Sequence, residues 1–333
     1  MACAALWAPL GWGAGFSTSA QGTTTAEFLR LGVGGRAISM GGAYTAVTDD
    51  AGSLYWNPAG LSRIESRSAT FMHAAYLGTS YYDYAAYGRK SAEGSALGLG
   101  LQYFSAGALP QTDDTGTGIG NFSPYDLAAS VGYAYTFEEW PVAGLQDWSA
   151  GLAGKFIRSK ILSSAQTEAV DFGVLSPGYF GGKLRLALAA ANIGGKMKFE
   201  AESEELPMTF KVGGASQLTE NWLASVDVCA PKDDKPYAAV GTEYWLVTGG
   251  PLRLAGRAGF NSETVGKVEG LTGATFGIGL VYGGASMDYA FAPMGALGMT
   301  HRISLSFKWE ATRSTYRPEL NIEAPEHPIL LLK

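Results

Sequence analysis

Between residues 69 and 309 the chain repeats segments in which apolar and polar residues alternate. In the last segment the apolar side chains share one face: Ile303, Leu305, Phe307 and Trp309. The polar side chains share the other face: Arg302, Ser304, Ser306 and Lys308. Because strand side chains point alternately to two faces, this period of two predicts β-strands. About fourteen such segments are present: 69–77, 80–89, 94–105, 123–137, 147–161, 167–180, 183–193, 206–218, 221–230, 236–247, 251–261, 271–282, 284–291 and 300–309.

The lengths of the segments and of their connections favour a membrane barrel. Many segments have 10–14 residues, which suits a strand tilted across a membrane. The longest connections are residues 106–122, 194–205 and 262–270, and all three follow odd-numbered segments. Most even-numbered connections are tight turns, and only residues 138–146 are longer. Long loops at one end and short turns at the other are typical of outer-membrane barrels.

Composition supports the same class. Charged residues make up 16% of the chain, against roughly 25% in soluble domains, and glycine and aromatic residues are plentiful. After residue 20 no run of 18 apolar residues occurs, so a membrane-spanning helix is not expected. We therefore predict an all-β fold, a transmembrane antiparallel barrel integral to the bacterial outer membrane and in contact with its lipid. A soluble all-β protein is the alternative.

The chain divides into four expected parts. Residues 1–20 resemble a signal peptide, with an apolar stretch before the small residues Thr18, Ser19 and Ala20. Residues 21–68 are rich in glycine and alanine and are expected to form an N-terminal hatch inside the lumen of the barrel, which spans residues 69–309. Residues 310–333 contain several prolines and are expected to form an extended tail.

Small residues recur on the predicted inner face of the strands: Gly98, Gly100, Gly132, Ala134, Gly151, Ala153, Ala187, Ala255, Gly277 and Gly279. A thin inner wall leaves room for an inserted peptide. The glycines can equally serve to relieve barrel curvature. Both interpretations are open at the level of sequence.

The expected hatch has a recognisable string of residues. Residues 36–47 favour a short helix that Gly41 and Gly42 weaken, and Asn57-Pro58 begins a turn. Its motifs are Gly35-Arg36-Ala37, Met40-Gly41-Gly42-Ala43, Asp49-Asp50 and Tyr55-Trp56-Asn57-Pro58-Ala59-Gly60-Leu61. This string, placed before a series of strands, resembles the FadL superfamily of outer-membrane transporters and, within it, the PorV/PorQ branch.

The resemblance implies a fourteen-stranded barrel with a hatch, and two functions. PorV/PorQ proteins assist type IX secretion by binding cargo or partner proteins at the outer membrane, which is the leading hypothesis. FadL-like proteins instead let fatty acids or other hydrophobic small molecules pass, through hatch movement or a kinked wall strand. For this second hypothesis the expected ligand path includes Leu54, Tyr55 and Trp56.

Several acidic residues alternate with apolar neighbours and are expected to face the lumen: Asp171, Asp227, Glu243 and Asp288. They can contact the hatch, line a path, or be satisfied by neighbouring polar groups. A further acidic pair, in Lys232-Asp233-Asp234-Lys235, is interpreted as the solvated tip of a hairpin.

The remaining motifs do not support catalysis. The chain has no cluster of Lys and Arg, which argues against nucleic acid as a partner. His73, His301 and His327 lack the spacing of metal ligands, so neither metal nor cofactor is expected. The triplet Asp114-Thr115-Gly116 resembles an aspartic-protease signature but lacks the second copy that the chemistry needs. We therefore predict that the protein is not an enzyme.

Overall fold

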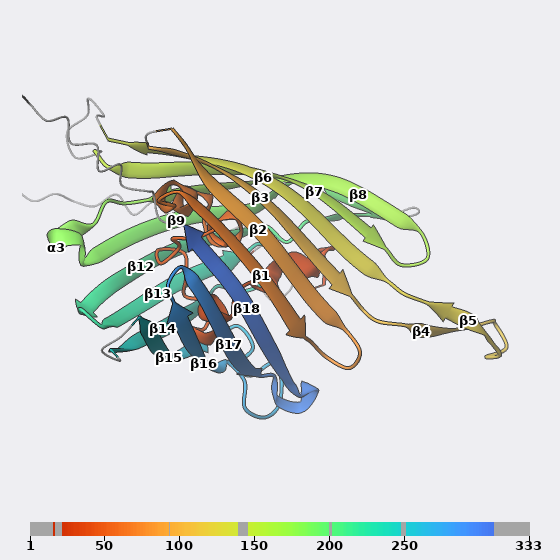
Figure 1. Ribbon diagram of the computed structural model, residues 1–333. Coiled ribbons are helices and arrows are strands. Elements are labelled where there is room, and N and C mark those ends of the chain that lie inside the picture. The colour runs from red at the N-terminus through yellow and green to blue at the C-terminus, as the bar shows by residue number, and fades with distance from the viewer. Residues whose placement is uncertain are drawn as a thin grey trace, which may run out of the picture.

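A computed structural model describes residue 16 and residues 22–92, 94–138, 146–199, 202–247 and 251–309. The expected signal peptide, apart from residue 16, and the expected tail lie outside the described residues. The described chain is mostly β-structure, and fourteen antiparallel strands close into a barrel (Figure 1). This confirms the predicted fold class. None of the described helices has the length and apolar character needed to cross a membrane.

The fourteen wall strands correspond closely to the predicted segments. They are β1 (Arg67–Ala75), β2 (Tyr81–Ala92), β3 (Ser95–Ser105), β6 (Tyr125–Phe137), β7 (Trp148–Lys160), β8 (Ser164–Leu175), β9 (Leu184–Gly194), β12 (Thr209–Thr219), β13 (Trp222–Pro231), β14 (Tyr237–Val247), β15 (Leu252–Asn261), β16 (Ala274–Tyr282), β17 (Ala285–Pro293) and β18 (Met299–Trp309). Each wall strand pairs with the next wall strand along the chain, and β1 pairs with β18 to close the wall.

Three local predictions differ from the structure. The segment predicted as 167–180 ends at Leu175, because Pro177 cannot donate a ladder hydrogen bond. Two long connections contain hairpins that the sequence did not predict. They are β4 (Leu109–Thr112) with β5 (Gly118–Phe122), and β10 (Lys196–Phe199) with β11 (Glu202–Glu205). The predicted helix over residues 36–47 is corrected below.

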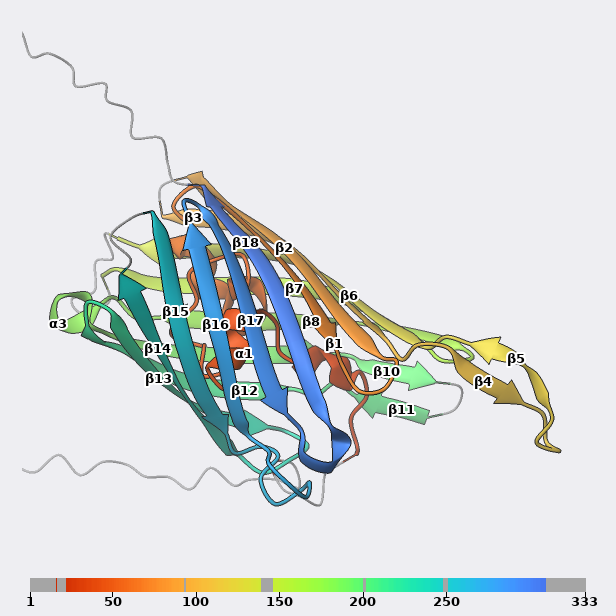
Figure 2. The ribbon, with the colours of Figure 1, turned by 60° about the horizontal axis from the view of Figure 1, so that its bottom comes forward.

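The two ends of the barrel differ. One end, here called the loop end, carries both hairpins and residues 262–273, which lie at the same end of the barrel in Figure 2. The opposite end, here called the turn end, carries mostly shorter connections, among them Gly283-Gly284, and also holds the first residue of β1 and the last of β18. Because outer-membrane barrels have short periplasmic turns, we infer that the turn end faces the periplasm.

The wall is apolar outside and polar inside. In β18, Ile303 and Leu305 are exposed on the outer face, whereas Arg302, Ser304 and Ser306 are buried on the inner face. A soluble protein buries its apolar face instead, so this inverted pattern requires lipid around the barrel.

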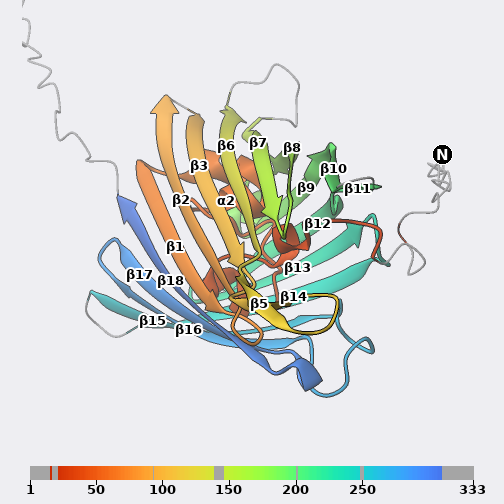
Figure 3. The ribbon, with the colours of Figure 1, turned by 90° about the vertical axis from the view of Figure 1, so that its right-hand side faces the viewer.

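The N-terminal segment, residues 22–66, lies inside the barrel (Figure 3). It contains short helices: η2 (Glu27–Arg30), α1 (Gly35–Ser39), α2 (Ser53–Trp56) and η3 (Pro58–Arg63). α1 packs against β15–β18, and η3 packs against β2, β3 and β6–β8. The predicted helix is wrong beyond Ser39, because Gly41 and Gly42 adopt φ angles of 69° and 77° and turn the chain.

Inner-face glycines let this segment approach the wall closely. A Cβ added to Gly151 of β7 would overlap the backbone of Pro58 and Ala59, and one added to Gly259 of β15 would overlap Met40 and Gly41. A Cβ added to other wall glycines would instead overlap side chains of the segment: Leu54 at Gly100 and Gly132, Leu61 at Gly98, and Ser39 at Gly277. The room predicted for an inserted peptide is therefore occupied by residues 22–66.

Gly151→Val is expected to displace the N-terminal segment from the wall, because the added side chain has no space beside Pro58 and Ala59. Overpacking of this kind costs about 1–3 kcal/mol. We expect a lower midpoint of urea unfolding for the purified barrel and faster trypsin cleavage at Arg36 and Arg63.

The matched control is Gly154→Val in the same strand. A Cβ at Gly154 has no neighbour within 4 Å, so this variant should unfold and resist trypsin like the wild type. Identical behaviour of the two variants would contradict the close approach of the segment to the wall.

Candidate functional site

A buried ion network joins α1 to the wall. The Arg36 guanidinium donates through Nε and Nη2 to the two carboxylate oxygens of Glu243 in β14, both at 2.8 Å. Arg257 in β15 donates to the same carboxylate at 2.7 Å and to Asp288 in β17 at 2.7 Å. The Glu243 side chain is only 1% exposed. A carboxylate so far from water is stable only with several charge-assisted hydrogen bonds, which the two arginines supply.

The network continues to the turn end through Asp49. Arg36 Nη1 lies 3.3 Å from Asp49, and Lys308 Nζ donates to the same oxygen of Asp49 at 2.9 Å. Burial opposes ionisation of Asp49, but Lys308 and Arg36 outweigh it and hold the pKa of this carboxyl below its ordinary value. Burial raises the pKa of the adjacent Asp50, and the neighbouring Asp49 charge adds to that rise.

The other predicted lumen acids have different partners. Asp227 in β13 accepts hydrogen bonds from the backbone N–H groups of Tyr44 and Thr45 at 3.0 and 2.9 Å, so it also holds the N-terminal segment. Asp171 in β8 pairs instead with groups on the neighbouring wall strands. Its carboxylate lies 2.7 Å from Lys155 Nζ and accepts a 2.7 Å hydrogen bond from the backbone of Asn192, where the β8–β9 ladder shifts register.

The remaining motif residues hold the segment in shape. Asn57 accepts a hydrogen bond from Ala59 N–H at 3.1 Å and caps η3, as expected for Asn before Pro58. Gly35 N–H donates to Ser304 at 2.9 Å, and Gly41 N–H donates to Thr275 at 2.9 Å. Met40 is fully buried, and Gly42 N–H donates to the Ala37 carbonyl.

The three residues of the expected ligand path lie in different surroundings. Leu54 belongs to a closed apolar cluster with Leu61 and Ile64. The Tyr55 hydroxyl accepts from Gly32 N–H at 2.9 Å. Trp56 Nε1 donates to the Val33 carbonyl at 3.0 Å, and Lys211 lies 4.8 Å from the centre of the Trp56 ring.

Trp56 separates two interior cavities. A cavity of about 490 Å³ lies toward the turn end, and a smaller one of about 130 Å³ lies toward the loop end. Among the described lining residues, only Trp56 borders both. Both cavities have many polar and charged lining groups, so they do not form the apolar path that a hydrophobic ligand would need.

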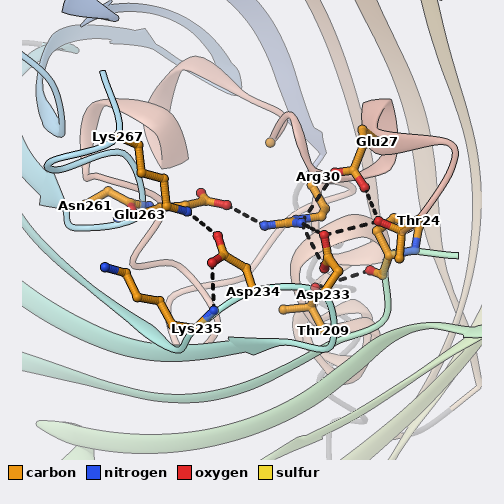
Figure 4. Close-up of polar contacts among 12 residues, drawn as sticks. Thr24, Glu27, Arg30, Thr209, Asp233, Asp234, Lys235, Asn261, Glu263 and Lys267 are labelled. Carbon is orange, nitrogen blue, oxygen red and sulfur yellow. Dashed lines mark hydrogen bonds and ion pairs between the residues drawn. The ribbon is translucent and has the colours of Figure 1, made fainter. Parts of the chain in front are cut away.

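A second polar cluster, which sequence reasoning missed, anchors the segment at the loop end (Figure 4). Arg30 donates to Asp233 at 3.0 and 3.2 Å and to Glu263 at 2.5 Å. Thr24 donates to Asp233 at 3.1 Å and to Glu27 at 2.5 Å. The cluster joins three regions that are distant in sequence, so no local signal marks it.

The interpretation of residues 232–235 as a solvated tip is therefore wrong. Asp233 and Asp234 are only 6% and 5% exposed. Asp233 pairs with Arg30 and Asp234 with Lys267, so both turn inward toward cations of other segments (Figure 4). Within the described residues, no group of three or more His, Cys, Asp or Glu has the arrangement of a metal site.

A closed barrel with an apolar exterior and its own N-terminal segment in the lumen is an integral outer-membrane β-barrel. Residues 17–229 match the family model described as "Type IX secretion system protein PorV". The chain belongs to this PorV family, which confirms the predicted resemblance. No curated protein sequence matches the chain.

Solved structures with a similar fold include hydrocarbon transporters. The Ralstonia pickettii toluene transporter TbuX has a TM-score of 0.53 at 12% identity, covering 84% of this chain and 99% of that one. The P. putida toluene transporter TodX has a TM-score of 0.53 at 11% identity, covering 84% of this chain and 99% of that one. The monoaromatic hydrocarbon channel CymD gives 0.55 at 11%, covering 84% and 98%. At these identities the similarity shows the fold alone. The family and these neighbours are non-enzymatic kinds of protein.

Glu243→Gln is expected to destabilise the barrel strongly, because Arg36 and Arg257 would lose the charge that compensates them. Breaking a buried pair from one side costs about 3–5 kcal/mol. Urea unfolding in detergent measures this loss, and a double-mutant cycle with Arg36→Gln isolates the coupling between the two residues. Glu220→Gln, in an exposed turn, is the control and should have no effect. Equal stability of both variants would contradict the role of the network.

Proposed function

We propose that this protein assists type IX-like protein secretion by binding a cargo or partner protein at the loop end of the barrel. Membership of the PorV family is the observation that carries this proposal. In this proposal residues 21–68 act as a hatch that keeps the lumen closed, and binding takes place at the rim. The Arg30 cluster at one end and the Arg36 network at the other support such a fixed hatch.

The β4–β5 hairpin supports binding at the rim. It projects beyond the wall (Figure 1), and in the described structure its two strands pair only with each other. Both outer edges therefore have unpaired backbone groups, which favour pairing with an extended strand of another protein. Ile119 on β5 is 58% exposed and offers an apolar contact beside that edge.

The tip of this hairpin is held in shape before any partner binds. The Asp113 carboxylate accepts from the backbone N–H groups of Thr115 and Thr117, both at 2.9 Å. The Thr115 hydroxyl also donates to this carboxylate, at 2.7 Å. The hydroxyl bond lowers the pKa of Asp113 most, and the two backbone hydrogen bonds lower it further. The triplet that resembles a protease signature lies at this turn. A pre-ordered hairpin loses less entropy on binding than a flexible loop.

Replacing residues 108–123 by Gly-Ser-Gly is expected to abolish secretion of cargo proteins while leaving the barrel folded, because the hairpin lies outside the closed wall. Ile119→Pro is a finer variant: proline removes a backbone donor from the edge strand and should reduce secretion about tenfold or more. Cargo is measured by immunoblot of the culture medium.

Ile119→Val is the matched control and should secrete normally, because it keeps both the strand and the apolar contact. Normal secretion by cells that lack the whole gene would remove the proposed function. If the deletion strain fails to secrete cargo but the hairpin variants secrete it normally, the binding surface lies elsewhere on the rim.

A second candidate function is passive transport of a fatty acid or other hydrophobic small molecule. An apolar groove of about 320 Å³ at the loop end favours it, with Phe28, Leu31 and Phe104 among its lining residues. The fold shared with TbuX and TodX is compatible with it. The unbroken pairing of β3 with β6 and the polar turn-end cavity weigh against it, since neither provides an apolar exit.

If transport is the function, Phe104→Asp should reduce uptake of labelled oleate or toluene about tenfold, because a carboxylate in the groove repels an apolar ligand. Phe104→Leu is the control and should retain uptake. Uptake that is unchanged when the gene is deleted would exclude this candidate.

A further inference from the structure

The turn-end cavity has an unusual set of charged lining groups. It is bounded by the N-terminal segment on one side and by β1 and β14–β18 on the other, and it reaches the turn end at Gly283-Gly284 and Trp309. Its volume of about 490 Å³ lies within the range of small-molecule pockets, roughly 300–1,000 Å³.

The ion network beside this cavity is balanced within itself. Its three cations are Lys308, Arg36 and Arg257, and its three carboxylates are Asp49, Glu243 and Asp288. Each of these groups has at least one partner of opposite charge within 3.3 Å. No charged group of the network is therefore available to bind a ligand.

Three further arginines line the cavity without a carboxylate partner among the described residues: Arg63, Arg67 and Arg253. Among the hydrogen bonds of the described residues, the Arg63 guanidinium donates to the Thr48 carbonyl alone, at 3.3 Å. Arg253 stacks on the Trp245 ring at 4.4 Å. Stacking occupies the flat face of a guanidinium and leaves its N–H edge available to an anion.

Among the described lining residues, two carboxylates stand outside the network, Asp50 and Glu65. Burial raises the pKa of Asp50, which weakens its contribution of negative charge. Glu65 is exposed at the rim, as are Arg67 and Arg253, so the three arginines still outnumber the two carboxylates. Burial lowers the pKa of Arg63 to about 10, so this guanidinium stays charged at neutral pH. The cavity therefore carries a surplus of positive charge.

Hydroxyl groups line the same cavity. Ser286 on β17 and Ser304 and Ser306 on β18 face the cavity, together with Thr70 on β1. Guanidinium edges with nearby hydroxyl donors are the groups that bind phosphate and carboxylate oxygens in proteins.

We propose that the turn-end cavity binds an anionic group of the phosphate or carboxylate class, with Arg63 and Arg253 as its principal cations. The anion enters from the turn end, where the lining includes Arg67 and Trp309. Two sources share this chemistry, a soluble anion and the phosphate of a lipid headgroup. The site is independent of cargo binding at the loop end.

The test uses the full-length protein purified in a neutral detergent. Thermal unfolding and titration calorimetry are recorded in potassium phosphate and in potassium chloride of equal ionic strength. A second arm compares the protein in phosphatidylcholine vesicles with and without phosphatidylglycerol. We expect phosphate or phosphatidylglycerol to raise the unfolding temperature relative to its control, since a ligand of the folded state stabilises it.

Arg63→Gln and Arg253→Gln should each weaken the apparent affinity about tenfold or more, because each removes charge-assisted hydrogen bonds to the anion. Arg253 lies outside the buried network, so its variant is expected to fold even if the Arg63 variant does not. Arg89→Gln removes an exposed arginine at the same end, outside the cavity, and should bind like the wild type.

Stabilisation by phosphate ion identifies a soluble ligand, and stabilisation by phosphatidylglycerol alone identifies a headgroup. Either result supports the site if the Arg253 variant loses it. The proposal is overturned if no probe stabilises the protein, or if Arg253→Gln and Arg89→Gln respond alike.

Discussion

The pairing of Arg36 with Glu243 is the interaction on which the barrel interior depends. Glu243 lies on a membrane-spanning strand, almost sealed from water, where an isolated carboxylate would be very unfavourable. Arg36, on α1, donates hydrogen bonds to both carboxylate oxygens of Glu243, and Arg257 on the next strand donates a further one. The wall therefore needs the N-terminal segment for its electrostatic balance, and the segment needs the wall to hold its helix in place.

Shape complements this charge pairing. Wall glycines such as Gly151 and Gly259 admit backbone where any Cβ would collide with it. Close packing without the ion network would leave charged groups unpaired, and the network without the glycines would have no room to form. Together they explain how a lumen lined with polar groups is filled by a segment that is itself rich in glycine and alanine.

The filled lumen gives the two ends of the barrel different chemistry. The loop end presents an apolar groove and a hairpin with free strand edges, whereas the turn end presents a cationic cavity. Arg30 fixes the segment at one end and Asp49 at the other, with Trp56 between the interior cavities. Such an arrangement favours binding at the two rims over passage through the centre.

The sequence by itself determined the strands, the inverted wall and the cap at Asn57, because alternation and capping are set by neighbouring residues. It also identified the lumen acids, but not their partners. That Glu243 meets Arg36 while Asp171 meets Lys155 was decided only by the closed barrel. The burial of Asp233 was likewise decided by tertiary structure. In each case the deciding contact comes from a distant part of the chain, so the local sequence pattern cannot predict it.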